Sequence, residues 1–193
     1  MVRSIDHSRP AEPQYIGVRC SADEYLALDH DGFRYQLING VVIMSPRPTP
    51  HHQSILLAIL RQIDPAALSL GGAVLPEVDL RLAPDLVYSP DVCYVGPGRA
   101  FPRDQALSLV PDMVVEILSP SSRRMDLRTK RADYERFGVR EYWVVEPDER
   151  RVRVFRLSGG VYAETICEGA TAASEVIPGF AFDLDALRAA MAG

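Results

Sequence analysis

The segment Met113-Val114-Val115-Glu116-Ile117-Leu118 most constrains the fold of this chain, because it places one ionisable residue in an otherwise apolar run. Short apolar runs bounded by turn residues are typical of a strand that is buried on both faces of a sheet. An ionised carboxylate in such a strand needs a partner, since without one it neutralises or binds a cation or a metal. Glu116 therefore indicates chemistry rather than packing.

The elements around this strand predict a mixed α/β fold. Ser119-Pro120-Ser121-Ser122 supplies a turn and a helix cap, and a helix then runs to about Phe137, where Gly138 ends it. A further strand follows at residues 141–145. This order predicts one central strand, helix, strand unit on a largely antiparallel sheet.

Apolar periodicity and turn residues predict the remaining elements. Asn39-Gly40 is the favoured two-residue type I′ turn, so the strands on either side of it form a hairpin near the N-terminus. We expect the other helices at residues 21–29, 51–63 and 184–191, and the other strands at 35–38, 41–44, 74–82, 86–88, 91–95, 151–157 and 161–167.

Length and composition set outer bounds. The chain has 193 residues, 47% of them hydrophobic, which predicts a single domain at residues 19–193 after an N-terminal arm at 1–18. No apolar run approaches the roughly 20 residues of a membrane span, and the N-terminus lacks the apolar centre of a secretion signal. We therefore expect a cytoplasmic protein with no membrane partner. Three scattered cysteines predict neither a disulfide framework nor a cysteine metal site.

The helix after the buried strand carries a second informative residue. Its inward stripe includes Leu127 and Tyr134, and Lys130 falls on the same stripe. Glu116 lies about 7 Å before the strand end, and Lys130 lies about 10 Å along the helix that returns over the sheet. Both residues therefore lie at a similar distance from that end of the sheet. The structural alternative is an ion pair of Lys130 with Glu116, or with Asp126 four residues earlier.

A metal site needs a second carboxylate close to Glu116. Asp112 shares its strand face, but four residues of rise separate the two by about 13 Å, too far to share an ion. Asp91 begins another strand and can lie beside Glu116 across a ladder spacing of roughly 5 Å. Asp91 is therefore the predicted ligand, and Asp79, on the polar face of its strand, is the reserve ligand.

An Asp, a Glu and a Lys in this arrangement form a known chemical unit. Two carboxylates can hold Mg²⁺, with water and a substrate phosphate in its remaining positions, and the lysine orients water or offsets charge in the transition state. These three residues with Mg²⁺ are therefore suited to the hydrolysis of a phosphodiester bond. Arg123, Arg124 and Arg128, at the start of the same helix, would hold backbone phosphates; the alternative is that they form only a solvated face.

Several segments in fixed order carry a resemblance to a known family. Together they are similar to the Uma-type putative restriction endonuclease family, which belongs to the PD-(D/E)xK nuclease superfamily. The resemblance extends from about residue 21 to residue 165. The segments are Tyr35–Gly40, Ser45–Pro46, His52–Gln53, Ser89–Val92, Pro111–Ser121, Lys130 with Tyr134, and Gly138–Trp143.

The resemblance implies a restriction-endonuclease-like core, a mixed central sheet flanked by helices with extra antiparallel strands. It implies that Asp91 and Glu116 are the metal carboxylates and that Lys130 is the catalytic lysine, displaced onto the helix. Leu118 stands where the usual motif of the superfamily has its lysine. His52 matches a recurring family histidine, which either caps and packs its helix or positions phosphate or water.

These observations predict a Mg²⁺-dependent endonuclease acting on DNA, with Mn²⁺ able to substitute. Cutting both strands of a duplex favours a homodimer. One alternative is a nuclease-fold protein that has lost catalysis and binds nucleic acid or a protein. A net charge of −5 favours this alternative. So does Gln36, which stands where related chains often have an acidic residue that could assist the metal. A non-nucleic-acid hydrolase or a structural module is a third possibility.

Overall fold

A computed structural model describes residues 12–192. Its helices are α1 (Ala22–Leu26), α2 (Pro50–Ser69), α3 (Arg131–Phe137) and α4 (Leu184–Ala192), and a π-helical segment, η1 (Met125–Lys130), leads directly into α3. Its strands are β1 (Arg34–Ile38), β2 (Val41–Ser45), β3 (Ala73–Pro76), β4 (Leu80–Ala83), β5 (Leu86–Tyr88), β6 (Val92–Val95), β7 (Met113–Ile117), β8 (Glu141–Glu146), β9 (Arg151–Ser158), β10 (Val161–Cys167), β11 (Thr171–Ala173) and β12 (Ala181–Asp183).

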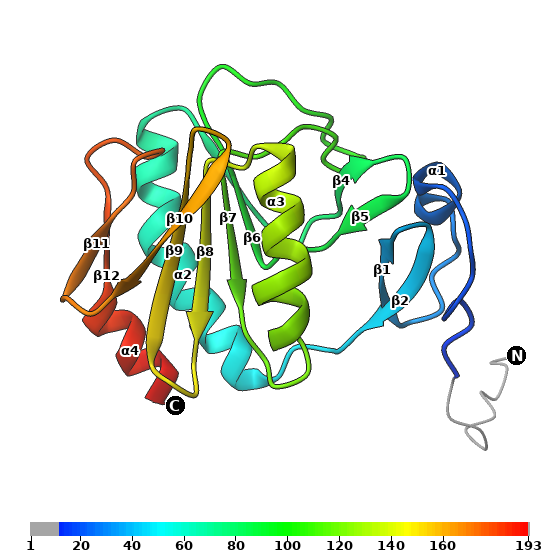
Figure 1. The fold of residues 1–193 in the computed structure, drawn as a ribbon, viewed down its shortest axis with the longest axis horizontal. Coiled ribbons are helices and arrows are strands. Elements are labelled where there is room, and N and C mark those ends of the chain that lie inside the picture. The colour runs from blue at the N-terminus through cyan, green and yellow to red at the C-terminus, as the bar shows by residue number, and fades with distance from the viewer. Residues whose placement is uncertain (1–11, 193) are drawn as a thin grey trace, which may run out of the picture.

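The strands form a large mixed sheet and a smaller antiparallel one beside it (Figure 1). The larger sheet has the order β10-β9-β8-β7-β6-β3, and the smaller has the order β2-β1-β5-β4. Only β7 and β8 pair in parallel within these described strands, and η1 and α3 connect them. The predicted strand, helix, strand unit on a largely antiparallel sheet is therefore confirmed.

The larger sheet buries a core on each face. On one face, α2 and α4 enclose side chains that include Val115 and Ile117 of β7 (Figure 1). On the other face, α3 and the smaller sheet enclose Val114 and Leu118. Successive residues of a strand point to opposite faces, so Glu116 shares the α3 side with Val114. All five residues of β7 are buried, as the apolar run predicted.

One predicted strand is wrong, and the reason is a backbone turn. The alternation at residues 74–82 predicts a single strand, but the chain forms β3 in the larger sheet and β4 in the smaller one. Between them Glu77 has a φ of 50°, in the left-handed region that side chains other than glycine rarely adopt. The chain therefore changes sheets at Glu77, a step that alternation of polar and apolar residues does not reveal.

Other boundaries differ from the prediction. The helix expected at residues 51–63 extends through Ser69, because Ala67 continues its buried stripe. The short strands β11 and β12, with three residues each, were not predicted. The helix expected after the turn at 119–122 begins with the π-helical η1. Such segments are rare and recur at functional sites, and apolar spacing gives no signal for them.

The expected N-terminal arm at residues 1–18 falls only partly within the described chain, since residues 1–11 lie outside it. Gly17 donates its N–H to the carbonyl of Val42 at 2.9 Å, and Val42 donates to Val18 at 2.8 Å. Packing against β2 therefore begins before residue 19.

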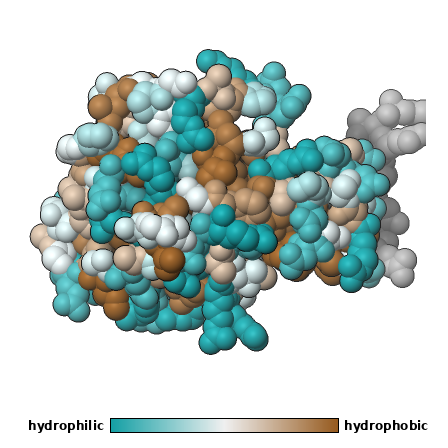
Figure 2. All heavy atoms as spheres, turned by 45° about the horizontal axis from the view of Figure 1, so that its top comes forward, coloured by the Kyte–Doolittle hydropathy of each residue, from teal (hydrophilic) through white to brown (hydrophobic). Residues whose placement is uncertain are grey.

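The face drawn in Figure 2 carries mostly hydrophilic residues, with hydrophobic residues gathered between the larger body and the smaller lobe. Beneath the surface a buried core joins the two sheets, where Leu80 and Tyr88 pack with Val95 and Val114. Within residues 12–192, no helix has both the length and the hydrophobicity needed to cross a membrane.

Candidate active site

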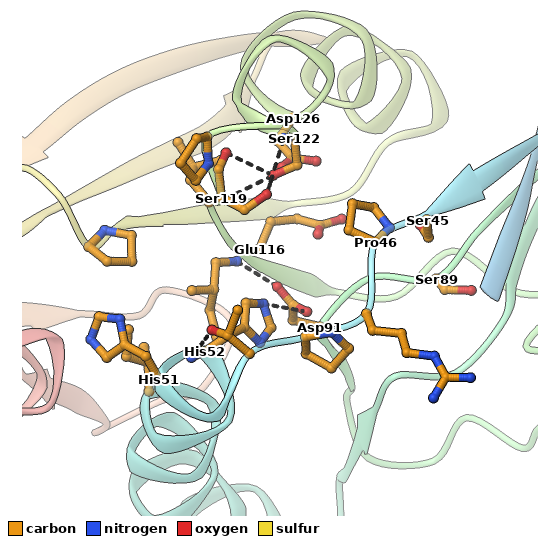
Figure 3. Close-up of a pocket in the computed structure, with 18 of the residues that line it drawn as sticks. Ser45, Pro46, His51, His52, Ser89, Asp91, Glu116, Ser119, Ser122 and Asp126 are labelled. Carbon is orange, nitrogen blue, oxygen red and sulfur yellow. Dashed lines mark hydrogen bonds and ion pairs between the residues drawn. The ribbon is translucent and has the colours of Figure 1, made fainter. Parts of the chain in front are cut away.

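A cavity of about 200 Å³ opens at the end of β7, bordered by the start of α2, by η1 and by the β1–β2 hairpin. Figure 3 shows Asp91 and Glu116 reaching it from neighbouring segments, with His52 on the α2 side and Asp126 on the helix above. Lys130 also lines it. The structure thus brings the three predicted catalytic residues into one cavity.

Strand pairing places Asp91 beside Glu116. Val92 of β6 faces Val115 of β7 in the antiparallel register, so the next pair in the ladder is Asp91 with Glu116. Directly opposed residues project to the same face of a sheet. Asp91 Oδ2 also accepts a hydrogen bond from the Ile117 N–H at 2.6 Å, which fixes the carboxylate at the end of β7.

Lys130 links two buried carboxylates. Its Nζ lies 2.8 Å from Glu116 Oε1 and 3.0 Å from Asp126 Oδ1. Tyr134 O–H donates to the same Glu116 oxygen at 3.0 Å. Both ion pairs considered as structural alternatives are therefore present together. These ion pairs are compatible with a catalytic role for Lys130, because the three charged groups also line the cavity.

The charges in this cluster do not cancel. Burial opposes the charge on Lys130, but the carboxylates of Glu116 and Asp126 outweigh burial and raise its pKa. Burial raises the pKa of Glu116 against the pull of Lys130, and Asp126 and Asp91 add to the rise. Lys130 is therefore an ammonium, and one ammonium cannot neutralise three carboxylates. The part of the cavity between β7 and η1 therefore carries excess negative charge when all three are ionised, which favours a bound cation there.

His52 adds a further polar group beside Asp91. Its Nε2 lies 3.3 Å from Asp91 Oδ1. Burial favours neutral imidazole, but the hydrogen bond and charge of Asp91 outweigh burial and raise the pKa of His52. The backbone N–H of His52 donates to Oγ1 of Thr49, the N-cap residue of α2, at 3.2 Å. The backbone of His52 thus takes part in the helix cap, and its ring contacts Asp91.

Gln36 reaches the cavity from β1. Its Nε2 donates to Ser45 Oγ, while its Oε1 is buried and has no hydrogen-bond partner among the described residues. Ser45, Ser119 and Ser122 also line the cavity and had no predicted site role. The available signal was the Ser-Pro pairs at 45–46 and 119–120 and, for Ser122, the turn at 119–122.

The structure does not bring the other predicted residues into this cavity. Asp79, the reserve ligand, accepts a hydrogen bond from Ser89 at 2.6 Å in a neighbouring pocket, because the turn at Glu77 carries it toward the smaller sheet. That assignment is therefore corrected. The three predicted phosphate-binding arginines are Arg123, Arg124 and Arg128. They line a separate groove, which shares only Pro120 with the cavity.

The donor set fits a metal held by two carboxylates. Within residues 12–192, no group of three or more His, Cys, Asp or Glu could hold an ion by itself. Mg²⁺ commonly uses one or two protein carboxylates and completes its octahedron with water and substrate oxygens. The hydrogen bonds that Glu116 accepts from described residues both fall on Oε1. Its second oxygen and the carboxylate of Asp91 are acceptors of the kind that such an ion uses.

Comparison with known proteins agrees with this fold. The chain matches the Uma2 family, described as a putative restriction endonuclease, over residues 22–186, and it belongs to that family. A crystal structure of a putative nuclease from Anabaena variabilis superposes with a TM-score of 0.75, covering 89% of this chain and 99% of that chain at 19% identity. This likeness confirms the predicted fold. No protein of curated function matches the chain.

Proposed function

We propose that this protein is a Mg²⁺-dependent endonuclease that hydrolyses phosphodiester bonds in DNA, with Mn²⁺ able to substitute. The observation that carries the proposal is the contact of Lys130 Nζ with Glu116 Oε1, at 2.8 Å, in a cavity that Asp91 also lines. Membership of a putative restriction endonuclease family supports nuclease function.

Asp91 and Glu116 would hold the metal, which when bound polarises the phosphate and lowers the pKa of its water. In hydrolysis a water oxygen forms a bond to phosphorus and the bond from phosphorus to the leaving sugar oxygen breaks. The attacking water loses a proton to solvent, and the leaving oxygen takes up a proton from solvent. Lys130 is already protonated, so it cannot accept the proton of the attacking water. Its role is to donate hydrogen bonds to the oxygens on which negative charge builds.

The DNA backbone would approach across Pro120, which borders both the cavity and the arginine groove. Arg124 and Arg128 are exposed there and can contact phosphates. Arg123 is partly committed, because its guanidinium pairs with Glu146 at 2.9 Å and Glu149 at 3.0 Å. A homodimer would supply one cavity for each strand of a duplex.

The alternative is a protein that binds nucleic acid or a protein partner without catalysis. The observation in its favour is that Lys130 is paired with two carboxylates at once, Glu116 and Asp126, and so is less available to substrate. A supercoiled plasmid incubated with purified protein separates the two functions. Cleavage with Mg²⁺ that EDTA abolishes supports the enzyme; binding without cleavage supports the alternative.

Metal titration tests the ligands. Calorimetry with Mn²⁺ should detect binding to the wild type and no binding to Asp91→Ala or Glu116→Ala, with circular dichroism showing that both variants fold. Asp79→Ala is the matched control, because Asp79 is a carboxylate outside the cavity, and it should bind Mn²⁺ as the wild type does. Undiminished binding in both ligand variants would refute the assignment.

A further inference from the structure

Arg34 lines the cavity from β1, although the sequence analysis gave it no role. Its side chain is 32% exposed and donates from Nη1 to Glu77 Oε1 at 2.6 Å. A guanidinium has five N–H donors arranged as a planar fork that matches the oxygens of a phosphate. The ion pair with Glu77 uses one edge of this fork, so other donors remain for a ligand in the cavity.

Glu77 links Arg34 to the backbone of Asp91. The backbone N–H of Glu77 donates to the carbonyl of Asp91 at 3.1 Å, and its side chain holds Arg34. Glu77 also has the left-handed φ of 50° that moves the chain from one sheet to the other. Residues with such backbone strain cluster at functional sites, where the surrounding structure maintains them. Glu77 therefore holds the guanidinium of Arg34, which comes from the smaller sheet, near Asp91.

Two arginines line the cavity, Arg34 and Arg47. Arg47 lies on the same side of the cavity, where it is exposed and donates to the Gly32 carbonyl. This wall of the cavity therefore carries positive charge opposite the wall that η1 forms.

We propose that Arg34 binds a backbone phosphate of the substrate strand, next to the phosphate that is cleaved. This inference rests on the proposed function and adds a second phosphate contact to it. The strand would run from Arg34 on the smaller sheet, across the cavity and over Pro120, to Arg124 and Arg128. If Arg34 only forms an ion pair that links two sheets, its substitution should leave the salt dependence of DNA binding unchanged.

Fluorescence anisotropy with a short labelled DNA duplex, with Ca²⁺ in place of Mg²⁺, measures binding without relying on cleavage. Arg34→Gln should raise Kd about tenfold and lower the slope of log Kd against log salt by about one, as loss of one phosphate contact does. Arg136→Gln is the matched control, because Arg136 also pairs with one carboxylate, Asp133 at 2.9 Å, but does not line the cavity. Its Kd and slope should equal those of the wild type.

Arg34→Lys is a second variant that tests the inference if Arg34→Gln does not fold. It keeps the charge and can still pair with Glu77 but loses the fork, so we expect a smaller rise in Kd and an unchanged salt slope. A folded Arg34→Gln with wild-type Kd and slope overturns the inference while leaving plasmid cleavage, and so the proposed function, intact. If Arg34→Gln does not fold, wild-type affinity in Arg34→Lys overturns it. A wild type that binds no DNA overturns both.

Discussion

Glu116 of β7 and Glu141 of β8 are buried glutamates on neighbouring parallel strands, yet their oxygens are satisfied differently. Their exposed fractions are 4% and 1%. Glu141 accepts hydrogen bonds on both oxygens, whereas Glu116 accepts them on Oε1 alone among the described residues. The donors to Glu141 are Trp143 Nε1, Ser174 Oγ, the Glu175 N–H and Arg156 Nε.

This comparison teaches that burial alone does not mark a functional carboxylate. Glu141 is saturated by fixed donors and stabilises the packing of residues 174–175 against β8. Glu116 keeps unused acceptor capacity toward a cavity, and its cation, Lys130, is shared with Asp126. An incompletely satisfied carboxylate can exchange partners with a ligand, and a saturated one cannot do so without destabilising the fold.

The largest expected effect is loss of cleavage in Glu116→Gln. The neutral amide is a poor metal ligand, so the cleavage rate should fall by about 10³-fold, in line with removal of a main electrostatic group. Quantitative plasmid cleavage measures the rate, and chemical denaturation should show a free energy of unfolding within about 1 kcal/mol of wild type. Cleavage at the parental rate would remove Glu116 from the site.

Lys130→Gln should reduce cleavage by about 10²-fold while Mn²⁺ binding is kept. The amide can still donate a hydrogen bond to Glu116, but it supplies no positive charge to the transition state. Cleavage kinetics and calorimetry on the same preparation separate the two effects. A variant that cuts as fast as its parent would assign Lys130 to the structural ion pair alone.

Glu141→Gln should change stability and leave the site intact. The amide nitrogen cannot accept hydrogen bonds, so the donors that share one carboxylate oxygen lose their acceptor. The free energy of unfolding should fall by about 2 kcal/mol. Urea denaturation measures this loss, and Mn²⁺ affinity in the folded protein should match the wild type. Wild-type stability together with weakened metal binding would instead assign Glu141 to the metal site.

The mildest change is one of pH, which alters metal binding without any substitution. The pKa of Glu116 is raised, so in the metal-free protein Glu116 keeps its proton at a pH where ordinary carboxylates have lost theirs. Metal binding must release that proton, so affinity should fall about tenfold per pH unit below this pKa. Calorimetry in buffers of different ionisation enthalpy counts the released proton. Affinity that stays constant from pH ~8 to pH ~6 would show that Glu116 is already ionised.

Sequence reasoning located the three proposed catalytic residues for physical reasons that are local. The apolar run fixed β7 and hence the burial of Glu116, and helical spacing placed Lys130 on the inward stripe. Asp91 followed from the geometry of neighbouring strands. The same reasoning does not separate Glu116 from Glu141, which lies in an equally buried strand, because the difference lies in partners that come from distant segments.

The sequence by itself determined the strand, helix, strand unit around β7, the burial of that strand and the family to which the chain belongs. Only the tertiary structure decided that Glu77 turns the chain between two sheets, which removes Asp79 from the cavity and holds Arg34 at its wall. It also decided that the helix after β7 begins with the π-helical segment η1, which holds both Asp126 and Lys130. Periodic patterns record which face of an element is buried, whereas contacts between distant segments depend on how whole sheets and helices pack.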